Sequence, residues 1–192
     1  MSMWLRRPSA AVVAQVLAEA KSAAPTYPEV GATQGAQLPS GYRHDGYERR
    51  LGEGAEVFER AAAAVRAWQA QVGAGVELFP PGALVGDEDT VVLLFRVLGL
   101  WATLPCRVVY VEQESDRFAF AYGTLPGHPE RGEVRFAVER EAGDEIVFRI
   151  VSFSRTVDPL ARLGSPVTRR IQQRVTERYL DAIAAATVRG LG

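Results

Sequence analysis

The sequence predicts an α+β fold in which a curled antiparallel sheet of six to seven strands grips a long C-terminal helix, with an N-terminal helical extension. Two patterns carry this prediction. From residue 90 to residue 154, apolar residues recur at the period of β-strands, and short segments of turn residues separate the runs. After Phe153 the period becomes that of an amphipathic helix. A sheet of this size curls, and a terminal helix can cover its concave face.

Size and composition indicate one globular domain with an extension, divided into residues 1–46 and residues 47–192. The apolar content of 47% and the charged content of 23% are typical of such a protein. A formal net charge of −1 gives no general attraction to nucleic acid, and we expect no nucleic-acid partner. The only cysteine, Cys106, excludes an internal disulfide. The longest apolar run, residues 90–101, is too short to span a membrane, so we expect a cytoplasmic protein.

The N-terminal part is expected to contain one helix and an extended segment. Ser9 is a favourable N-cap for a helix that ends near Ala24, because Pro25 follows. Residues 25–46 contain Pro, Gly, Tyr and Thr without a sustained period, which predicts an extended wrap over the body of the protein. A first strand is expected at residues 42–51.

A second helix and a short strand precede the strand-rich region. Apolar residues repeat at helical spacing between Gly54 and Val72, and residues 76–79 then predict a short strand. The strand segments that follow are residues 90–101, 106–112, 117–122, 133–140 and 145–153. The connections between them are short, which favours antiparallel hairpins. A final helix is expected from Pro166 to Ala186.

The least ordinary segment of the chain is FAFAYGTLPGHPERGEVRF, at residues 118–136. Strand period stops after Tyr122 and resumes at Gly132, which leaves a loop of about nine residues that contains His128. Loops of this length inside compact domains are often functional. A proline-stiffened turn that only determines strand register explains the same residues equally well.

Three residues of this segment are candidate catalytic residues. His128, Glu130 and Tyr122 could supply a general acid and a general base. The alternative, which we favour because no nucleophile lies nearby, is that His128 packs between prolines while Glu133 pairs with an arginine. The spacing of the His and Glu residues within a Gly/Pro loop is unlike the helical metal-binding motifs, so no metal and no cofactor is expected. We expect Cys106 to be a small buried apolar side chain.

A curled sheet that grips a helix often leaves an apolar space between the two. The candidate ligand-binding residues combine aromatic side chains that could line this space with charged side chains that could anchor a carboxylate or phosphate. They are Tyr122, Phe120, Glu133, Arg135 and Arg107. The alternative is that the aromatic residues are ordinary core and that the arginines lie on a solvated outer face.

The segment YGTLPGHPERGE, from Tyr122 to Glu133, resembles the central motif of an uncharacterised bacterial and plant family catalogued as domain of unknown function nineteen-ninety. Further matching segments include Gly41-Tyr42, Pro105-Cys-Arg-Val-Val-Tyr and Phe153-Ser-Arg. Val134 departs from the family pattern, which tends towards a second acidic residue there. The resemblance implies no established activity. The order of elements is similar to the helix-grip architecture of the START and Bet v 1-like superfamily, which implies a fold and not a function.

Three hypotheses of function follow. The first is a protein that binds a small apolar or amphipathic, lipid-like molecule between the sheet and the C-terminal helix. The second is an enzyme of cyclase or hydrolase type with acid and base residues in the 123–133 loop. The third is a protein interaction module that uses the same loop. Ligand identity, oligomeric state and pathway stay open.

Overall fold

The computed structural model describes residues 2–156 and 165–189. Its strands are β1 (Ser2–Trp4), β2 (Arg43–Glu53), β3 (Glu77–Phe79), β4 (Thr90–Val97), β5 (Leu100–Gln113), β6 (Arg117–Thr124), β7 (Glu130–Arg140) and β8 (Glu145–Thr156). Its helices are α1 (Ala10–Lys21), the 3-10 helix η1 (Ala32–Gln34), α2 (Ala55–Arg66), α3 (Gln69–Gly73) and α5 (Ser165–Arg189).

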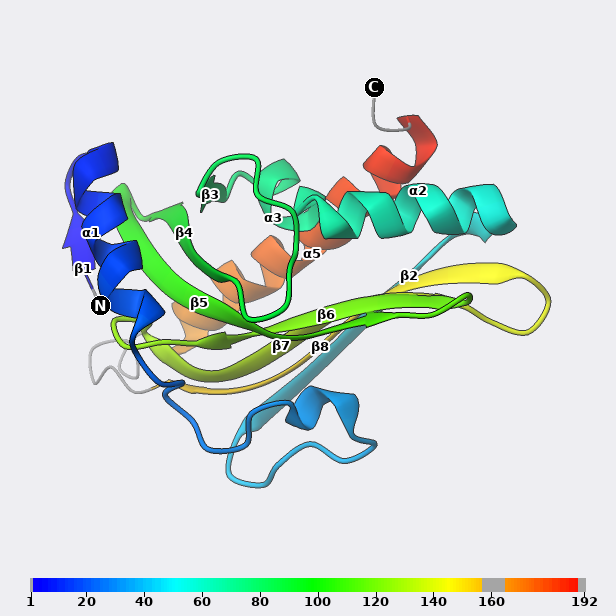
Figure 1. The fold of residues 1–192 in the computed structure, drawn as a ribbon, viewed down its shortest axis with the longest axis horizontal. Coiled ribbons are helices and arrows are strands. Elements are labelled where there is room, and N and C mark those ends of the chain that lie inside the picture. The colour runs from blue at the N-terminus through cyan, green and yellow to red at the C-terminus, as the bar shows by residue number, and fades with distance from the viewer. Residues whose placement is uncertain (1, 157–164, 190–192) are drawn as a thin grey trace.

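The strands form one eight-stranded antiparallel sheet in the order β2-β8-β7-β6-β5-β4-β3, and β1 pairs with β5 outside this order (Figure 1). The predicted α+β class is therefore confirmed, and so is the long C-terminal helix. The sheet has one strand more than expected because the short β1, near the N-terminus, joins it. The division of the chain at residue 46 stays a prediction.

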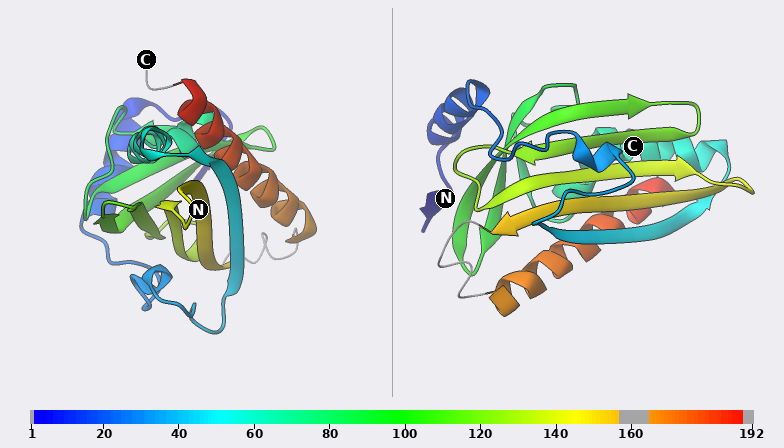
Figure 2. Two further views of the ribbon diagram at one scale, coloured as in Figure 1. Left: turned by 90° about the vertical axis from the view of Figure 1, so that its right-hand side faces the viewer. Right: turned by 90° about the horizontal axis from the view of Figure 1, so that it is seen from below.

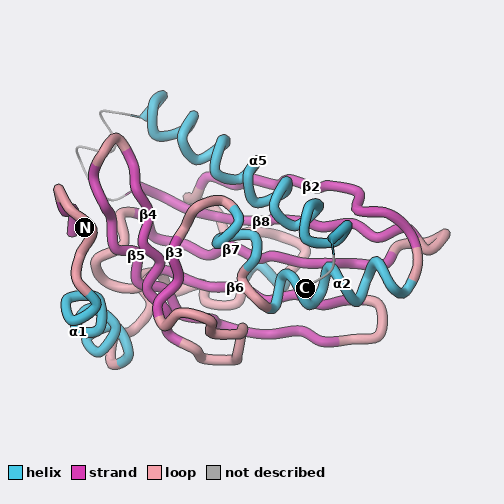
Figure 3. The backbone as a smooth tube through the Cα atoms, turned by 90° about the horizontal axis from the view of Figure 1, so that it is seen from above, coloured by secondary structure: helices cyan, strands magenta, loops and turns pink. Residues whose placement is uncertain are grey.

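The main hydrophobic core lies on the concave face of the sheet, beneath α2, α3 and α5. Figure 1 shows α2 and α3 above the sheet, and Figure 3 shows α5 crossing the strands diagonally beside them. At the centre of this core, Phe120 of β6 and Phe136 of β7 stack with their ring centroids 5.4 Å apart. Trp68, between α2 and α3, packs edge-on against Phe120 at 4.9 Å. All three rings are fully buried.

The opposite face is covered near β4 and β5 by α1. Ser9 caps this helix as predicted, since its hydroxyl accepts a hydrogen bond from the Val12 N–H. The apolar contacts between α1 and the sheet form a second, smaller core that contains Val13, Leu17, Val92 and Leu94. Both faces of the sheet are thus partly covered by other elements. Burial of a side chain therefore does not show which face of the sheet it lies on.

The predicted strand at residues 90–101 and the predicted connection at residues 103–105 are wrong. Leu98 and Gly99 have φ values of 50° and 84° and form a turn that divides the apolar run, whereas residues 103–105 lie inside β5. Pro105 is tolerated in β5 because β6 ends at Thr124, opposite Cys106, and no β6 residue pairs with the proline.

The loop between β6 and β7 is shorter than expected and comprises residues 125–129. It is a tight turn in which the His128 N–H donates to the Leu125 carbonyl at 3.1 Å. At its base, the Gly132 N–H donates to Thr124 Oγ1 at 3.1 Å. These bonds hold the two strand ends together.

An extended segment between α1 and β2, which also contains η1, crosses the convex face of the sheet (Figure 2). It is held by the carboxylate of Glu133, a β7 residue that is 3% exposed. The Tyr27 hydroxyl donates to this carboxylate at 2.7 Å, and the Gly31 N–H donates at 2.7 Å. The Thr33 N–H donates at 2.9 Å, and the Thr33 hydroxyl donates as well. We call this set of contacts the Glu133 clamp.

The clamp depends on Gly123 of β6, because a Cβ at this position would lie 2.7 Å from Tyr27 Cζ. We expect Gly123→Ala to displace Tyr27 and to lower the free energy of unfolding by roughly 2–4 kcal/mol, since the buried Glu133 carboxylate would lose a donor. Urea denaturation measures the change. The control is Gly46→Ala on β2, where no described atom lies within 4 Å of the added methyl group. Equal losses for both variants would contradict the clamp.

Candidate functional site

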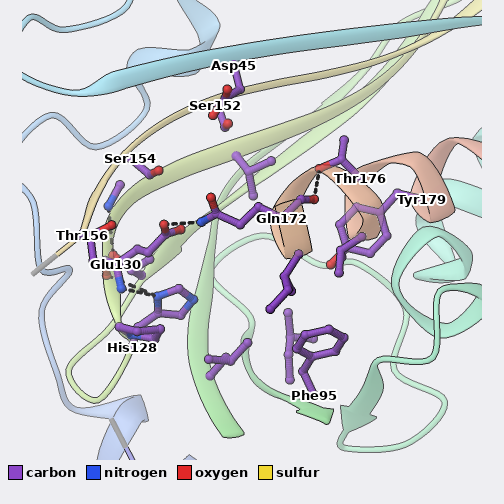
Figure 4. Close-up of a pocket in the computed structure, with 18 of the residues that line it drawn as sticks. Asp45, Phe95, His128, Glu130, Ser152, Ser154, Thr156, Gln172, Thr176 and Tyr179 are labelled. Carbon is purple, nitrogen blue, oxygen red and sulfur yellow. Dashed lines mark hydrogen bonds between the residues drawn. The ribbon is translucent and has the colours of Figure 1, made fainter. Parts of the chain in front are cut away.

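A cavity of about 520 Å³ lies between the concave face of the sheet and α5. The part nearest the main core, here called the core end, is bordered by Tyr122, Tyr179 and Leu93. The apolar wall continues through Phe95, Leu104, Val134, Ile150 and Val175. The other part, here called the polar end, is bordered by Asp45, His128, Glu130, Ser152 and Ser154 (Figure 4). This division matches the two halves of an amphipathic molecule.

At the polar end, the ring of His128 is held by the backbone of Glu130. The Glu130 N–H donates to His128 Nδ1 at 3.1 Å (Figure 4). The Glu130 carbonyl oxygen lies 3.2 Å from the same Nδ1 atom, so the ring accepts from the N–H with its proton on Nε2 and donates to the carbonyl with its proton on Nδ1. Burial lowers the pKa of His128 to about 4, so the ring is neutral at neutral pH. His128 therefore offers the cavity an uncharged imidazole ring that can take part in hydrogen bonds.

The Glu130 side chain links β7 to α5 across the cavity. The Gln172 Nε2 atom of α5 donates to Glu130 Oε1. Burial raises the pKa of Glu130, and the hydrogen bond from Gln172 opposes this rise. Gln172 Oε1 is buried and has no hydrogen-bond partner among residues 2–156 and 165–189. The polar end thus keeps one unused hydrogen-bond acceptor in addition to the His128 ring.

At the core end, two tyrosines from different elements border the cavity. Tyr122 comes from β6 and Tyr179 from α5, and Tyr122 is 8% exposed. Burial raises the pKa of both hydroxyls, so both stay protonated and can donate hydrogen bonds. Phe120, two residues before Tyr122 on the same strand face, lies in the main core under Trp68.

The three charged residues predicted to bind ligand have partners elsewhere. Glu133 borders the cavity, but its carboxylate is bound in the clamp. Arg135 pairs with Glu112 at 3.1 Å and with Glu139 at 3.2 Å. Arg107 donates to carbonyl groups of the last turn of α1 and of Ala23, which follows that helix. The structure therefore gathers His128, Glu130 and Tyr122 around one cavity, and a ligand-binding role for the other predicted residues stays a prediction.

Some residues of the cavity wall were missed by sequence reasoning. Ser152 and Ser154 follow Ile150 on one face of β8, and this change from apolar to polar residues on a single face was an available signal. Gln172 lies at the edge of the apolar stripe of α5. A polar residue at this position can contact the sheet that the stripe faces, which was a second available signal.

Cys106 is fully buried, as predicted, and burial raises the pKa of its thiol. Within the described ranges, no three His, Cys, Asp or Glu side chains come together in a way that could hold a metal ion. No helix of residues 2–156 or 165–189 is long and apolar enough to cross a membrane.

The lowered pKa of His128 predicts a pH dependence of stability. A histidine in the unfolded chain titrates near about 6.5, so the stabilisation from the neutral folded ring is complete above that pH and is lost as the pH falls towards about 4. The raised pKa of Glu130 acts in the opposite direction, so the test compares the wild type with His128→Gln.

We expect the difference in unfolding free energy, wild type minus His128→Gln, to be smaller at about pH 4.5 than at about pH 7, by roughly 1–2 kcal/mol. Urea titrations at the two pH values measure it. A difference that stays the same at both would contradict the burial of the neutral ring.

Comparison with known proteins relates this chain to a protein family. The family described as "Domain of unknown function (DUF1990)" matches residues 26–182. A UPF0548 protein of Deinococcus radiodurans is 37% identical over 194 residues, which cover 95% of this chain and 97% of that protein. A UPF0548 protein of Dictyostelium discoideum is 32% identical and covers 70% of this chain and 68% of its own length.

Solved structures share the fold at low identity. The Zhui aromatase/cyclase from Streptomyces sp. R1128 superposes with a TM-score of 0.56 at 15% identity, covering 77% of this chain and 94% of that one. Norcoclaurine synthase from Thalictrum flavum, in complex with dopamine and hydroxybenzaldehyde, gives 0.50 at 10% identity, covering 79% and 89%. These neighbours confirm the helix-grip architecture, and the sequence matches show that this chain belongs to the DUF1990 family.

Proposed function

We propose that this protein binds a small amphipathic, lipid-like molecule in the cavity between the sheet and α5. The observation that carries the proposal is the cavity itself, which has a volume of about 520 Å³ and an apolar wall with polar groups at one end. Ordinary packing leaves few voids larger than a water molecule, whereas ligand pockets measure about 300–1,000 Å³. The rest of the concave face is tightly packed around Phe120 and Phe136.

The two ends of the cavity suggest how such a molecule lies. The hydrocarbon part of the ligand would pack against Leu104, Val134 and Val175, away from water. Each methylene buried in this way would favour binding by about 0.8 kcal/mol. A polar group at the polar end could form a hydrogen bond with the His128 ring and donate to Gln172 Oε1. The complex of norcoclaurine synthase with two small aromatic molecules supports the proposal by analogy of fold.

A second proposal, favoured by one observation, is acid–base catalysis of cyclase or hydrolase type by His128, Glu130 and Tyr122. Burial lowers the pKa of His128 and raises the pKa of Glu130, so burial favours the neutral form of each and the cavity holds a neutral base beside a carboxyl group with a raised pKa. Incubation with a metabolite extract, followed by mass spectrometry, tests it. A compound that the wild type converts, and that His128→Gln binds without converting it, is the expected result. No conversion by the wild type would leave binding as the function.

Filling the cavity should abolish ligand binding. Val134 borders the cavity from the middle of β7, so a tryptophan there would occupy the apolar wall. We expect Val134→Trp to raise the Kd for the uncharged probe N-phenyl-1-naphthylamine, followed by its fluorescence, by about tenfold or more. The control is Val188→Trp on α5, at a position that is 82% exposed, which should leave the Kd unchanged. Equal affinity of the wild type and Val134→Trp, with both folded, would refute the proposed site.

A further inference from the structure

Behind the core end of the cavity, two polar side chains are buried without partners. Gln71 of α3 is 1% exposed, and neither its Nε2 nor its Oε1 has a hydrogen-bond partner among the described residues. Trp68 is fully buried, and its Nε1 also lacks a partner within those residues. Native proteins pair the large majority of such groups, so each exception requires an explanation.

These side chains adjoin the two tyrosines of the cavity wall. The Trp68 ring stacks on Tyr122 with a centroid distance of 5.7 Å. The Gln71 amide lies close to the Tyr122 hydroxyl and lowers the pKa of that hydroxyl, against the larger rise that burial causes. The distance and angles between the two groups do not form a regular hydrogen bond. Tyr122 and Tyr179 themselves border the cavity. The buried polar groups are therefore continuous with the place where the inner end of a ligand would lie.

The backbone holds Gln71 in this position at a cost. Trp68 has a φ of 57°, in the left-handed region that a bulky residue rarely adopts, and this break separates α2 from α3. Gly73 of α3 packs so closely on α5 that a Cβ there would lie 2.6 Å from Ala182 Cβ. Strained backbone of this kind clusters at binding and catalytic sites, which is a second reason to assign a function to this corner.

We propose that Gln71, Tyr122 and Tyr179 form a hydrogen-bonding site for an uncharged oxygen, a hydroxyl or a carbonyl, at the buried end of the ligand. The ligand class is then an amphiphile with a polar group at each end, such as an ω-hydroxy acid. Tyrosine hydroxyls donate to such an oxygen, and the Gln71 amide supports them as donor or acceptor. Burial disfavours a charged group here, as the raised pKa values of both tyrosines indicate. The inference rests on the proposed function, since it uses the same cavity.

A pair of probes that differ only in this oxygen tests the inference. The affinities of 12-hydroxydodecanoate and dodecanoate are measured by displacement of N-phenyl-1-naphthylamine. Transfer of the hydroxyl from water into the protein is unfavourable unless it gains hydrogen bonds there. In the wild type, we therefore expect the hydroxy acid to bind at least as tightly as dodecanoate, because the proposed site supplies those bonds. In Gln71→Met and in Tyr179→Phe, we expect its affinity relative to dodecanoate to fall about tenfold.

Stability and a matched control separate a binding role from a structural one. Gln71→Met removes an unpaired buried amide, so we expect its Tm to rise, whereas loss of a structural hydrogen bond would lower it. The control is Gln69→Met, on the same helix but away from this cavity, which should leave the affinity ratio unchanged.

Two failures remain distinguishable. If the wild type binds both acids and the ratio is the same in Gln71→Met and Tyr179→Phe, the inference is overturned, and a buried water or simple packing explains Gln71. A fall in the Tm of Gln71→Met would also overturn it. If the wild type binds neither acid nor the fluorescent probe, the proposed function itself fails, and the inference fails with it.

Discussion

The buried carboxylate of Glu133 is the interaction on which the arrangement of the site depends. A carboxylate at 3% exposure is tolerated only when hydrogen-bond donors surround it, and Tyr27, Gly31 and Thr33 provide them. All of these donors belong to the segment that follows α1. If this segment left the sheet, the buried Glu133 carboxylate would lose its hydrogen-bond donors. The Tyr27 ring also packs edge-on against Phe153, with a centroid distance of 5.6 Å. The N-terminal part is thereby tied to the back of β7.

The clamp and the cavity share one strand, so the same contacts serve both. Side chains alternate along β7, and Glu133 on the convex face places Gly132 and Val134 on the cavity side. Gly132 also joins the base of the short loop, since its N–H donates to Thr124 Oγ1. At the far end of the cavity, α3 and α5 pack closely and confine the tyrosines.

Periodicity was sufficient to predict the fold class, the terminal helix and most strands, because each depends on local patterning. It failed at Gly99, where one positive-φ turn divides an otherwise continuous apolar run. Phe120 and Tyr122 share a strand face, and which of them borders the cavity depends on where Trp68 and α3 lie, a contact between distant parts of the chain. The part that Glu133 would play in ligand binding stays a prediction, because both faces of the sheet are covered and alternation alone could not indicate which face carries the site.

Native mass spectrometry of the wild type and of Val134→Trp, each purified without added ligand, tests the central claim most directly. The account predicts that the wild type carries a non-covalent mass of a small amphipathic molecule, which fits a cavity of about 520 Å³. The same mass should be absent from folded Val134→Trp. An equal bound mass on both proteins, or a wild type without one that also fails to take up N-phenyl-1-naphthylamine, would contradict a ligand site between the sheet and α5.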